Sequence, residues 1–321
     1  MCEVNVDGFQ GWGIDHKRKL LFIRSKTAEA YIISFTKLSK EGKATLEELE
    51  SLIGKLNWLA TIILQARVLA PPIQWLLDRH KVLDASGKLK NKKMKVELGD
   101  FIRADLRIAT KLLKENSSIP AIYTVFNFFR WERSIDGTSD AAKTHGFGWV
   151  VHGTGQWASV PFKGSAWAML LDQNQAEGLG TLSLVLFLAQ RAHDEDCILR
   201  LEVDNSAIMA AVMKAGSFRP RLYAISRAIV VTAAKYNIRV YTRFVESDEN
   251  VADWPSRPDK TDWYKKFELA CAYHKGPWSK RPIHLTNEVK VDLEDLRLLV
   301  QLDVSPPLLS DSPIINTYNG S

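Results

Sequence analysis

The chain has 321 residues, of which 46% are hydrophobic and 25% charged, and its formal net charge is +6. This length suggests two domains of an ordinary folded protein, and the basic balance favours polyanionic partners such as nucleic acids. A membrane span is not expected because no run of about 18 uncharged apolar residues occurs. Residues 1–10 carry two acidic residues and no apolar core, which is not typical of a secretory signal.

The chain contains three cysteines, Cys2, Cys197 and Cys271. They lie far apart and form neither a CxxC pair nor a disulfide framework. We therefore expect an intracellular protein, in the cytoplasm or nucleus, without structural zinc.

The first third of the chain is predicted to be mainly helical. Residues 8–24 have the pattern of a short hairpin with a turn at 16–19. Thr45 and Glu48 form a capping-box sequence, and apolar residues then recur at helical spacing up to residue 63. Pro71 and Pro72 interrupt this pattern, a basic loop follows at 87–95, and a second helix is predicted over about 97–115.

The following region has the pattern of an α/β fold. The predicted elements, in chain order, are strands near 134–140, 147–151 and 157–162, a helix at 174–192, a strand at 197–203, a helix from Ser206 to Gly216, a helix at 221–236 and a strand at 238–245. Three antiparallel strands followed by crossover units predict a mixed five-stranded sheet with flanking helices. Aromatic residues after 260 indicate some further packing, whereas residues 305–321 are expected to fray.

Four acidic residues stand at or near the ends of these elements. Asp140 ends the first strand, Glu177 begins the apolar helix, Asp204 ends the fourth strand and Asp253 follows the fifth. Two Mg²⁺ ions held by carboxylates can activate water and neutralise the charge that develops when a phosphodiester is cut. The pattern therefore favours a two-metal site, with Mn²⁺ as a substitute ion.

Each of these acids also has a structural explanation. Asp140 fits a turn, Asp204 and the following Asn205 fit helix caps, and Glu177 suits a helix N-terminus. Asp253 fits an ordinary loop acid. The combination, in this order and on these elements, favours a common site over four separate explanations.

The pattern resembles the ribonuclease H domain of retroelement reverse transcriptases. Residues 138–142 (Thr-Ser-Asp-Ala-Ala) precede the Gly-Phe-Gly of 146–148, and residues 250–257 read Asn-Val-Ala-Asp-Trp-Pro-Ser-Arg. This ending is most similar to that of DIRS-type tyrosine-recombinase retrotransposons. The resemblance assigns the metal pair to Asp140, Glu177, Asp204 and Asp253, with Asp136 on the same strand face as an alternative first ligand.

The resemblance extends upstream and implies a domain organisation. Residues 11–15 resemble the hairpin that closes the reverse transcriptase palm, and residues 45–57 resemble its thumb helix. The implied units are a palm-end hairpin at 1–25, a helical thumb or connection region at 26–120, a ribonuclease H-like domain at 121–260 and a partly flexible C-terminal extension at 261–321.

The resemblance implies an endonuclease that hydrolyses the RNA strand of RNA–DNA hybrids, with a polymerase domain upstream or in trans. No Tyr/Phe-x-Asp-Asp motif occurs, so this chain is not expected to polymerise DNA alone. The loop at 244–249 lacks the histidine that many ribonucleases H place before the last aspartate, and Ala142 replaces a common serine.

Substrate contacts are expected from polar and basic residues. Asn205 is a candidate partner for RNA 2′-hydroxyl groups, and Lys92 and Lys93 for phosphates. Arg219, together with Arg221 and Arg227, would form a basic rim. The alternative function is a non-catalytic or domesticated module that keeps the fold to bind nucleic acid or a protein, and a third is a nuclease or integrase that acts on DNA.

Overall fold

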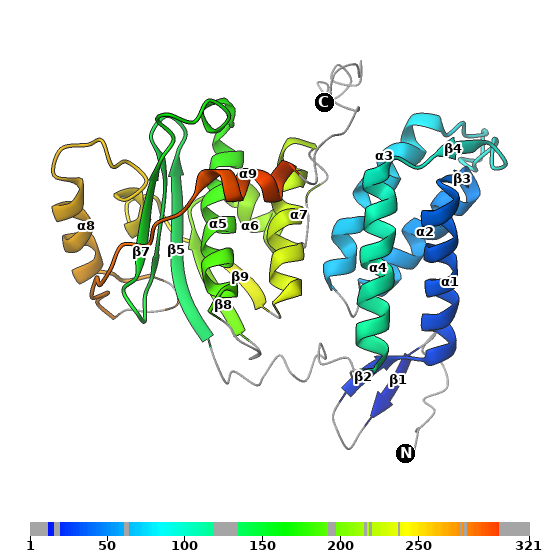
Figure 1. The fold of residues 1–321 in the computed structure, drawn as a ribbon, viewed down its shortest axis with the longest axis horizontal. Helices are drawn as coiled ribbons and strands as arrows, with labels where there is room; N and C mark the ends of the chain where they lie inside the picture. Colours follow the sequence, from blue (N-terminus) through cyan, green and yellow to red (C-terminus); the bar gives the residue numbers. More distant parts are fainter. Residues whose placement is uncertain are drawn as a thin grey trace.

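The computed structural model describes residues 12–15, 20–60, 64–118, 134–191, 197–214, 217, 220–236, 238–276, 278 and 281–301. A helical part built from the N-terminal third lies beside a sheet-containing part built from the rest (Figure 1). Each part has its own buried apolar core. Among the helices described, none has the length and apolar character needed to cross a bilayer.

The N-terminal part consists of short strands and packed helices. Its elements are β1 (Trp12–Asp15), β2 (Leu20–Ile23), α1 (Ser25–Glu41), β3 (Lys43–Thr45), α2 (Leu46–Leu59), the 3₁₀ helix η1 (Leu64–Leu69), α3 (Pro71–His80), β4 (Lys95–Glu97) and α4 (Asp100–Ser118). β1 pairs with β2 and β3 with β4, both antiparallel. The predicted hairpin is confirmed for its two strands, while its turn at 16–19 lies outside the described residues.

Two helices of this part are not evident in the sequence pattern. In α1 the buried positions include Ala28, Phe35 and Leu38, a sparse apolar stripe, and the helix ends at Gly42 in a left-handed conformation (φ 66°). Pro71 and Pro72 are predicted to interrupt the helical pattern, and in the structure they stand at the start of a separate helix. They begin α3, where a missing N–H costs nothing because the first turn has no intrahelical acceptors.

The predicted capping box at the start of α2 is confirmed. The Thr45 hydroxyl accepts from the Glu48 amide (3.2 Å), and the Glu48 carboxylate accepts from the Thr45 amide (2.8 Å). Thr45→Ala is expected to lower the free energy of unfolding by about 1 kcal/mol in urea denaturation, because alanine has no hydroxyl to accept from the Glu48 amide, although the backbone amide at position 45 remains. Glu50→Ala, an exposed change on the same helix, should have little effect; equal effects of the two variants would contradict this role.

The predicted mixed five-stranded sheet is confirmed. Its strands are β5 (Ser134–Ala142), β6 (Gly146–Val151), β7 (Trp157–Pro161), β8 (Cys197–Val203) and β9 (Ile238–Phe244), in the spatial order β7-β6-β5-β8-β9. β5, β6 and β7 are antiparallel neighbours, whereas β5, β8 and β9 run parallel. The protein is therefore an α/β protein with an N-terminal helical region.

Helices cover both faces of this sheet (Figure 1). On one side lie α5 (Gln173–Ala189), α6 (Ser206–Met213) and α7 (Pro220–Lys235), and on the other lies α8 (Trp263–Ala272). Alternate residues of β6 serve the two sides: Trp149 joins the core under α5, whereas Val150 packs with Phe267 of α8. The helix predicted from Ser206 begins at that residue as α6, and Asn205 caps it, as its sequence position allowed.

The C-terminal extension wraps around the edge strand β7. The amide of Val289 donates to the carbonyl of Trp157 (2.7 Å), and the amide of Thr286 donates to the carbonyl of Gly155 (2.9 Å). The chain then forms α9 (Leu293–Gln301), whose buried Leu296 joins the core on the α5 and α7 side. Residues 281–301 thus cover a sheet edge that would otherwise be free to pair. The stretch predicted to fray, 305–321, lies outside the described residues.

Helix α7 also joins the two parts of the molecule. Tyr223 and Val230 belong to the apolar core of the helical part, and the Tyr223 hydroxyl donates to the carbonyl of Val68 (2.9 Å). Arg227 forms a buried ion pair with Asp105 of α4. The helical part therefore packs against the sheet-containing part through apolar and ionic contacts.

Candidate functional site

Three of the four predicted acids converge at one edge of the sheet. β5 and β8 are parallel neighbours, so their carboxyl ends, which carry Asp140 and Asp204, lie at the same edge. Helix α5 packs on β5 and brings Glu177 to this edge. Carboxylate oxygens of Asp140, Glu177 and Asp204 all lie within 4.8 Å of one another. We call these three residues the acidic cluster.

Asp140 is buried and held from one side by the loop after β9. The hydroxyl of Ser256 donates to Oδ2 of Asp140 (2.6 Å) and also lies 2.9 Å from the carbonyl oxygen of Asp253. This loop lies directly over Gly148, where a Cβ atom would come within 2.7 Å of the Ser256 amide nitrogen. A glycine is needed at 148 because any side chain would push the loop, and with it Ser256, away from Asp140.

Glu177 is buried in the second turn of α5. Its Oε1 accepts from Nε2 of Gln173 (2.7 Å), and the same amide group donates to the carbonyl of Ala141 (2.6 Å). Gln173 stands one turn before Glu177, so both side chains lie on the same face of the helix. The glutamine thus links α5 to the end of β5 and fixes the carboxyl group of Glu177.

Burial and mutual repulsion keep protons on this cluster. Burial, together with the neighbouring charges of Asp140 and Asp204, raises the pKa of Glu177 to about 9, while hydrogen bonds involving Gln173 and the Ala141 backbone oppose the change. Burial also raises the pKa of Asp140 to about 6, with the Ser256 hydrogen bond acting in the opposite direction. A nearby cation would reverse both shifts by favouring the ionised forms.

Asp204 leaves one oxygen uncompensated. Its Oδ1 is buried and has no hydrogen-bond partner among the described residues. A buried acceptor without a partner is unfavourable, and a bound cation is one way to satisfy it. The donor set of the acidic cluster consists of carboxylate oxygens alone, which suits a hard divalent ion such as Mg²⁺ or Mn²⁺.

Asp253, the fourth predicted ligand, does not join the acidic cluster. It ends the 3₁₀ helix η4 (Val251–Asp253), and its carboxylate forms an ion pair with Arg257 one turn later. Asn250 anchors this turn, since its side chain accepts from the Ala252 amide (3.1 Å) and its Nδ2 lies 3.4 Å from the Ser139 carbonyl of β5. Of residues 250–257, Ser256 therefore contacts the acidic cluster, whereas the side chain of Asp253 is partly exposed and pairs with Arg257.

Asp136, the alternative first ligand, also lies outside the acidic cluster. Both of its carboxylate oxygens accept from Arg200 of β8, at 2.5 and 2.7 Å. Asp136 and Asp140 are predicted to lie on the same face of β5. Thr138, which lies between them, fits this prediction because its hydroxyl lies 3.2 Å from Oε2 of Glu202, its neighbour on β8. Of the two aspartates, the structure brings only Asp140 into the metal-compatible group.

The predicted substrate-binding residues are scattered. Asn205 uses its side-chain oxygen to cap α6 and donates from its amide to Asn174 (3.0 Å). Lys92 and Lys93 are exposed next to β4, at the end of the helical part remote from the five-stranded sheet (Figure 1). Arg219 and the side chain of Arg221 lie outside the described residues. The expectation that Arg227 contributes to a basic rim is wrong, because its side chain is buried against Asp105.

Several residues around the site are missed by sequence reasoning. Ser256 and Asn250 lie in the quoted motif, but their contacts depend on how the loop returns to β5. Gln173 has a weak local signal, its spacing of four residues before Glu177. A second metal-compatible group, formed by His152, Glu202 and His274, has no local signal because its members lie far apart in the chain.

The raised pKa of Glu177 predicts a pH-dependent stability in the absence of metal. The folded protein keeps this proton up to about pH 9, whereas an unfolded glutamate loses it near its ordinary value of 4.5. Stability is therefore fully present below about pH 4.5 and falls as pH rises toward 9, by an amount on the order of a few kcal/mol. Urea denaturation in EDTA at pH 6 and pH 8.5 should show this loss.

Glu177→Gln should flatten the pH dependence without abolishing it. Glutamine keeps the acceptor for Gln173 but has no proton to lose in this range. Asp140 and Glu202, whose pKa values are raised to about 6 and about 7 mainly by burial, contribute the same direction of change and remain in the variant. An unchanged slope in the variant would show that Glu177 is not held protonated.

Comparison with known proteins does not assign a function to this site. No protein-family model matches the chain, and no match to a curated protein was found.

Proposed function

We propose that the protein is a metal-dependent endonuclease that hydrolyses the RNA strand of RNA–DNA hybrids, as part of a retroelement reverse transcriptase. In this proposal the five-stranded sheet and its helices form a ribonuclease H-like domain, and the N-terminal helices form a thumb-like region. The observation that carries the proposal is the convergence of Asp140, Glu177 and Asp204, three acids separated by long stretches of sequence, within 4.8 Å at one sheet edge.

The residues present fit a pair of divalent cations. Asp140, Glu177 and Asp204 would hold the ions. The raised pKa values of Asp140 and Glu177, and the Oδ1 of Asp204 that has no partner among the described residues, are features that a cation would relieve. Bound Mg²⁺ ions would supply a water of lowered pKa and charge neutralisation at the leaving oxygen. Purely structural acids seldom gather in this way, since like charges at short range oppose folding.

The chain's own residues would act by positioning. Ser256 fixes the rotation of the Asp140 carboxylate, and Gln173 fixes that of Glu177. Arg257 forms an ion pair with Asp253. Asp253 would therefore lie beside the metal site and would bind an ion directly only if this ion pair opened. A guanidinium at this edge also offers a bidentate partner to a phosphate of the substrate strand.

Cleavage of labelled duplexes by the purified full chain tests the proposal. In Mg²⁺ the RNA strand of an RNA–DNA hybrid should be cut, EDTA should stop the reaction, and Mn²⁺ should restore it. DNA duplex and RNA duplex of the same sequence are the matched substrates and should remain intact. Cleavage of the DNA duplex instead would favour a DNA nuclease or integrase. Binding of the hybrid without cleavage in either metal would favour the non-catalytic module.

A further inference from the structure

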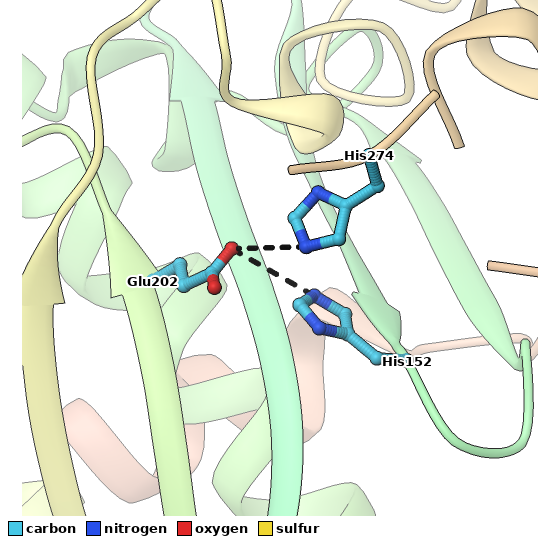
Figure 2. A group of neighbouring side chains, drawn as sticks. All are labelled: His152, Glu202 and His274. Atoms are coloured by element: carbon cyan, nitrogen blue, oxygen red, sulfur yellow. Dashed lines mark ion pairs between the residues drawn. The ribbon is translucent and has the colours of Figure 1, made fainter. Parts of the chain in front are cut away.

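A second group of ionisable side chains lies on the other face of the sheet from α5. His152 follows β6, Glu202 lies on β8 and His274 follows α8, and their side chains point toward one another (Figure 2). The side chains are buried, with 5% of His152 and none of Glu202 or His274 exposed. We call these three residues the His–Glu–His group. It shares no residue with the acidic cluster.

The spacing within the group suits a shared ion better than direct hydrogen bonds. Oε2 of Glu202 lies 3.5 Å from Nε2 of His274 and 4.0 Å from Nε2 of His152. N–H···O hydrogen bonds usually span about 2.7–3.2 Å. Donors placed tetrahedrally around Zn²⁺ lie roughly 3.4 Å apart, given Zn–N and Zn–O distances near 2.1 Å. The Glu202–His274 separation matches this value and the Glu202–His152 separation exceeds it slightly.

The protonation of the rings is compatible with metal binding. Burial of the His152 ring favours its neutral form, which keeps a lone pair on one ring nitrogen. The amide of Gly276 donates weakly to Nε2 of His274 (3.3 Å), which assigns a lone pair to this nitrogen as well. Two imidazole nitrogens and one carboxylate form a donor set that favours Zn²⁺ over Mg²⁺.

Backbone amides and the Thr138 hydroxyl also contact the His–Glu–His group. The Thr138 hydroxyl lies 2.6 Å from Nε2 of His152 and 3.2 Å from Oε2 of Glu202, so its single proton can go to Nε2 of His152, and an ion at this nitrogen would take the place of that bond. The Trp278 amide donates to Oε1 of Glu202 (3.3 Å), and a Cβ atom on Gly276 would come within 2.3 Å of that carboxylate. The glycine therefore allows the chain that carries His274 to approach Glu202 closely.

We propose that His152, Glu202 and His274 bind one Zn²⁺ ion that fastens the C-terminal extension to the sheet. Two ligands come from the sheet part and one from the segment after α8, so the ion cross-links regions distant in sequence. No cysteine takes part, which is why cysteine spacing gives no sign of the site. The proposal concerns structure and does not depend on nuclease activity.

Metal analysis of the full chain tests this site. After EDTA treatment, incubation with Zn²⁺ and desalting, we expect one retained Zn²⁺ per chain and a rise in Tm of roughly 5 °C. His274→Ala should lose the ion and the rise in Tm. His274→Cys should retain both, because a thiolate also binds Zn²⁺. His284→Ala, an exposed histidine of the same extension, is the matched control and should behave like the wild type.

Co²⁺ provides a readout that separates the two groups. Tetrahedral binding by two imidazoles and a carboxylate should give strong visible absorption, present in Asp204→Asn and absent in His274→Ala. No retained Zn²⁺, or equal retention by wild type and His274→Ala, would overturn the proposal and leave a hydrogen-bonded contact. Loss of Zn²⁺ in Asp204→Asn would also overturn it, by assigning the ion to the acidic cluster.

Discussion

Asp204→Asn is expected to lower the rate of Mg²⁺-dependent hybrid cleavage by roughly 1000-fold, which corresponds to about 4 kcal/mol of transition-state stabilisation. Asparagine keeps the size of the side chain but removes the charge that holds a cation. Asp204 also presents a buried oxygen at the acidic cluster that no described residue satisfies. The measurement is single-turnover cleavage of a labelled RNA–DNA hybrid by the full chain.

The same variant has a second, independent readout. Removing one carboxylate relieves repulsion on Asp140 and Glu177, so the free energy of unfolding in EDTA should stay the same or increase. Asp292→Asn, an exposed aspartate of the C-terminal extension, provides the matched change and should keep full activity. Full activity of Asp204→Asn would remove the acidic cluster from the reaction, and a less stable variant would leave the lost activity explained by misfolding.

Asp105→Ala is expected to destabilise the protein by about 3–5 kcal/mol, because removing one partner of a buried ion pair leaves the other charge buried and uncompensated. Asp105 and Arg227 are 1% and 2% exposed, and the Nε of Arg227 donates to Asp105 at 3.1 Å. The guanidinium also lies 4.8 Å from the centre of the Phe101 ring. Without Asp105 this cation would remain buried between α4 and α7. Urea denaturation of the full chain measures the effect.

A double substitution distinguishes charge from packing at this junction. Asp105→Leu combined with Arg227→Met replaces the pair with apolar side chains and should recover most of the lost stability. Asp100→Asn, in an exposed pair with Arg103 on the same helix, should cost less than about 1 kcal/mol. Equal costs for Asp100→Asn and Asp105→Ala, or additive effects in the double variant, would contradict a buried ionic junction.

The elements of the sheet-containing part are largely predictable from sequence because their signals are local. Alternation in 147–151 marks β6, and the apolar run after 174 marks α5, whose residues are buried on nearly all sides. The capping box at Thr45 fixes the start of α2 in the same way. In contrast, α1 buries only a narrow stripe, so its periodicity is weak and its packing against α4 decides its position.

The site is predictable in part. Asp140 and Asp204 end parallel neighbouring strands, so topology alone places them at one edge. Glu177 follows because α5 packs on β5. Asp253 shows the limit of this reasoning: its motif is recognisable, but its carboxylate pairs with Arg257 while Ser256 makes the contact with Asp140.

The sequence by itself determined the identity and order of the sheet elements and the acids that end them, since periodicity, turns and caps depend on neighbouring residues. Only the tertiary structure decided which side chains meet, how many protons they keep and where the C-terminal extension lies. The His–Glu–His group illustrates this, because His152 and His274 stand 122 positions apart in the chain. Contacts of this kind depend on strand register and burial, which no local segment of the chain encodes.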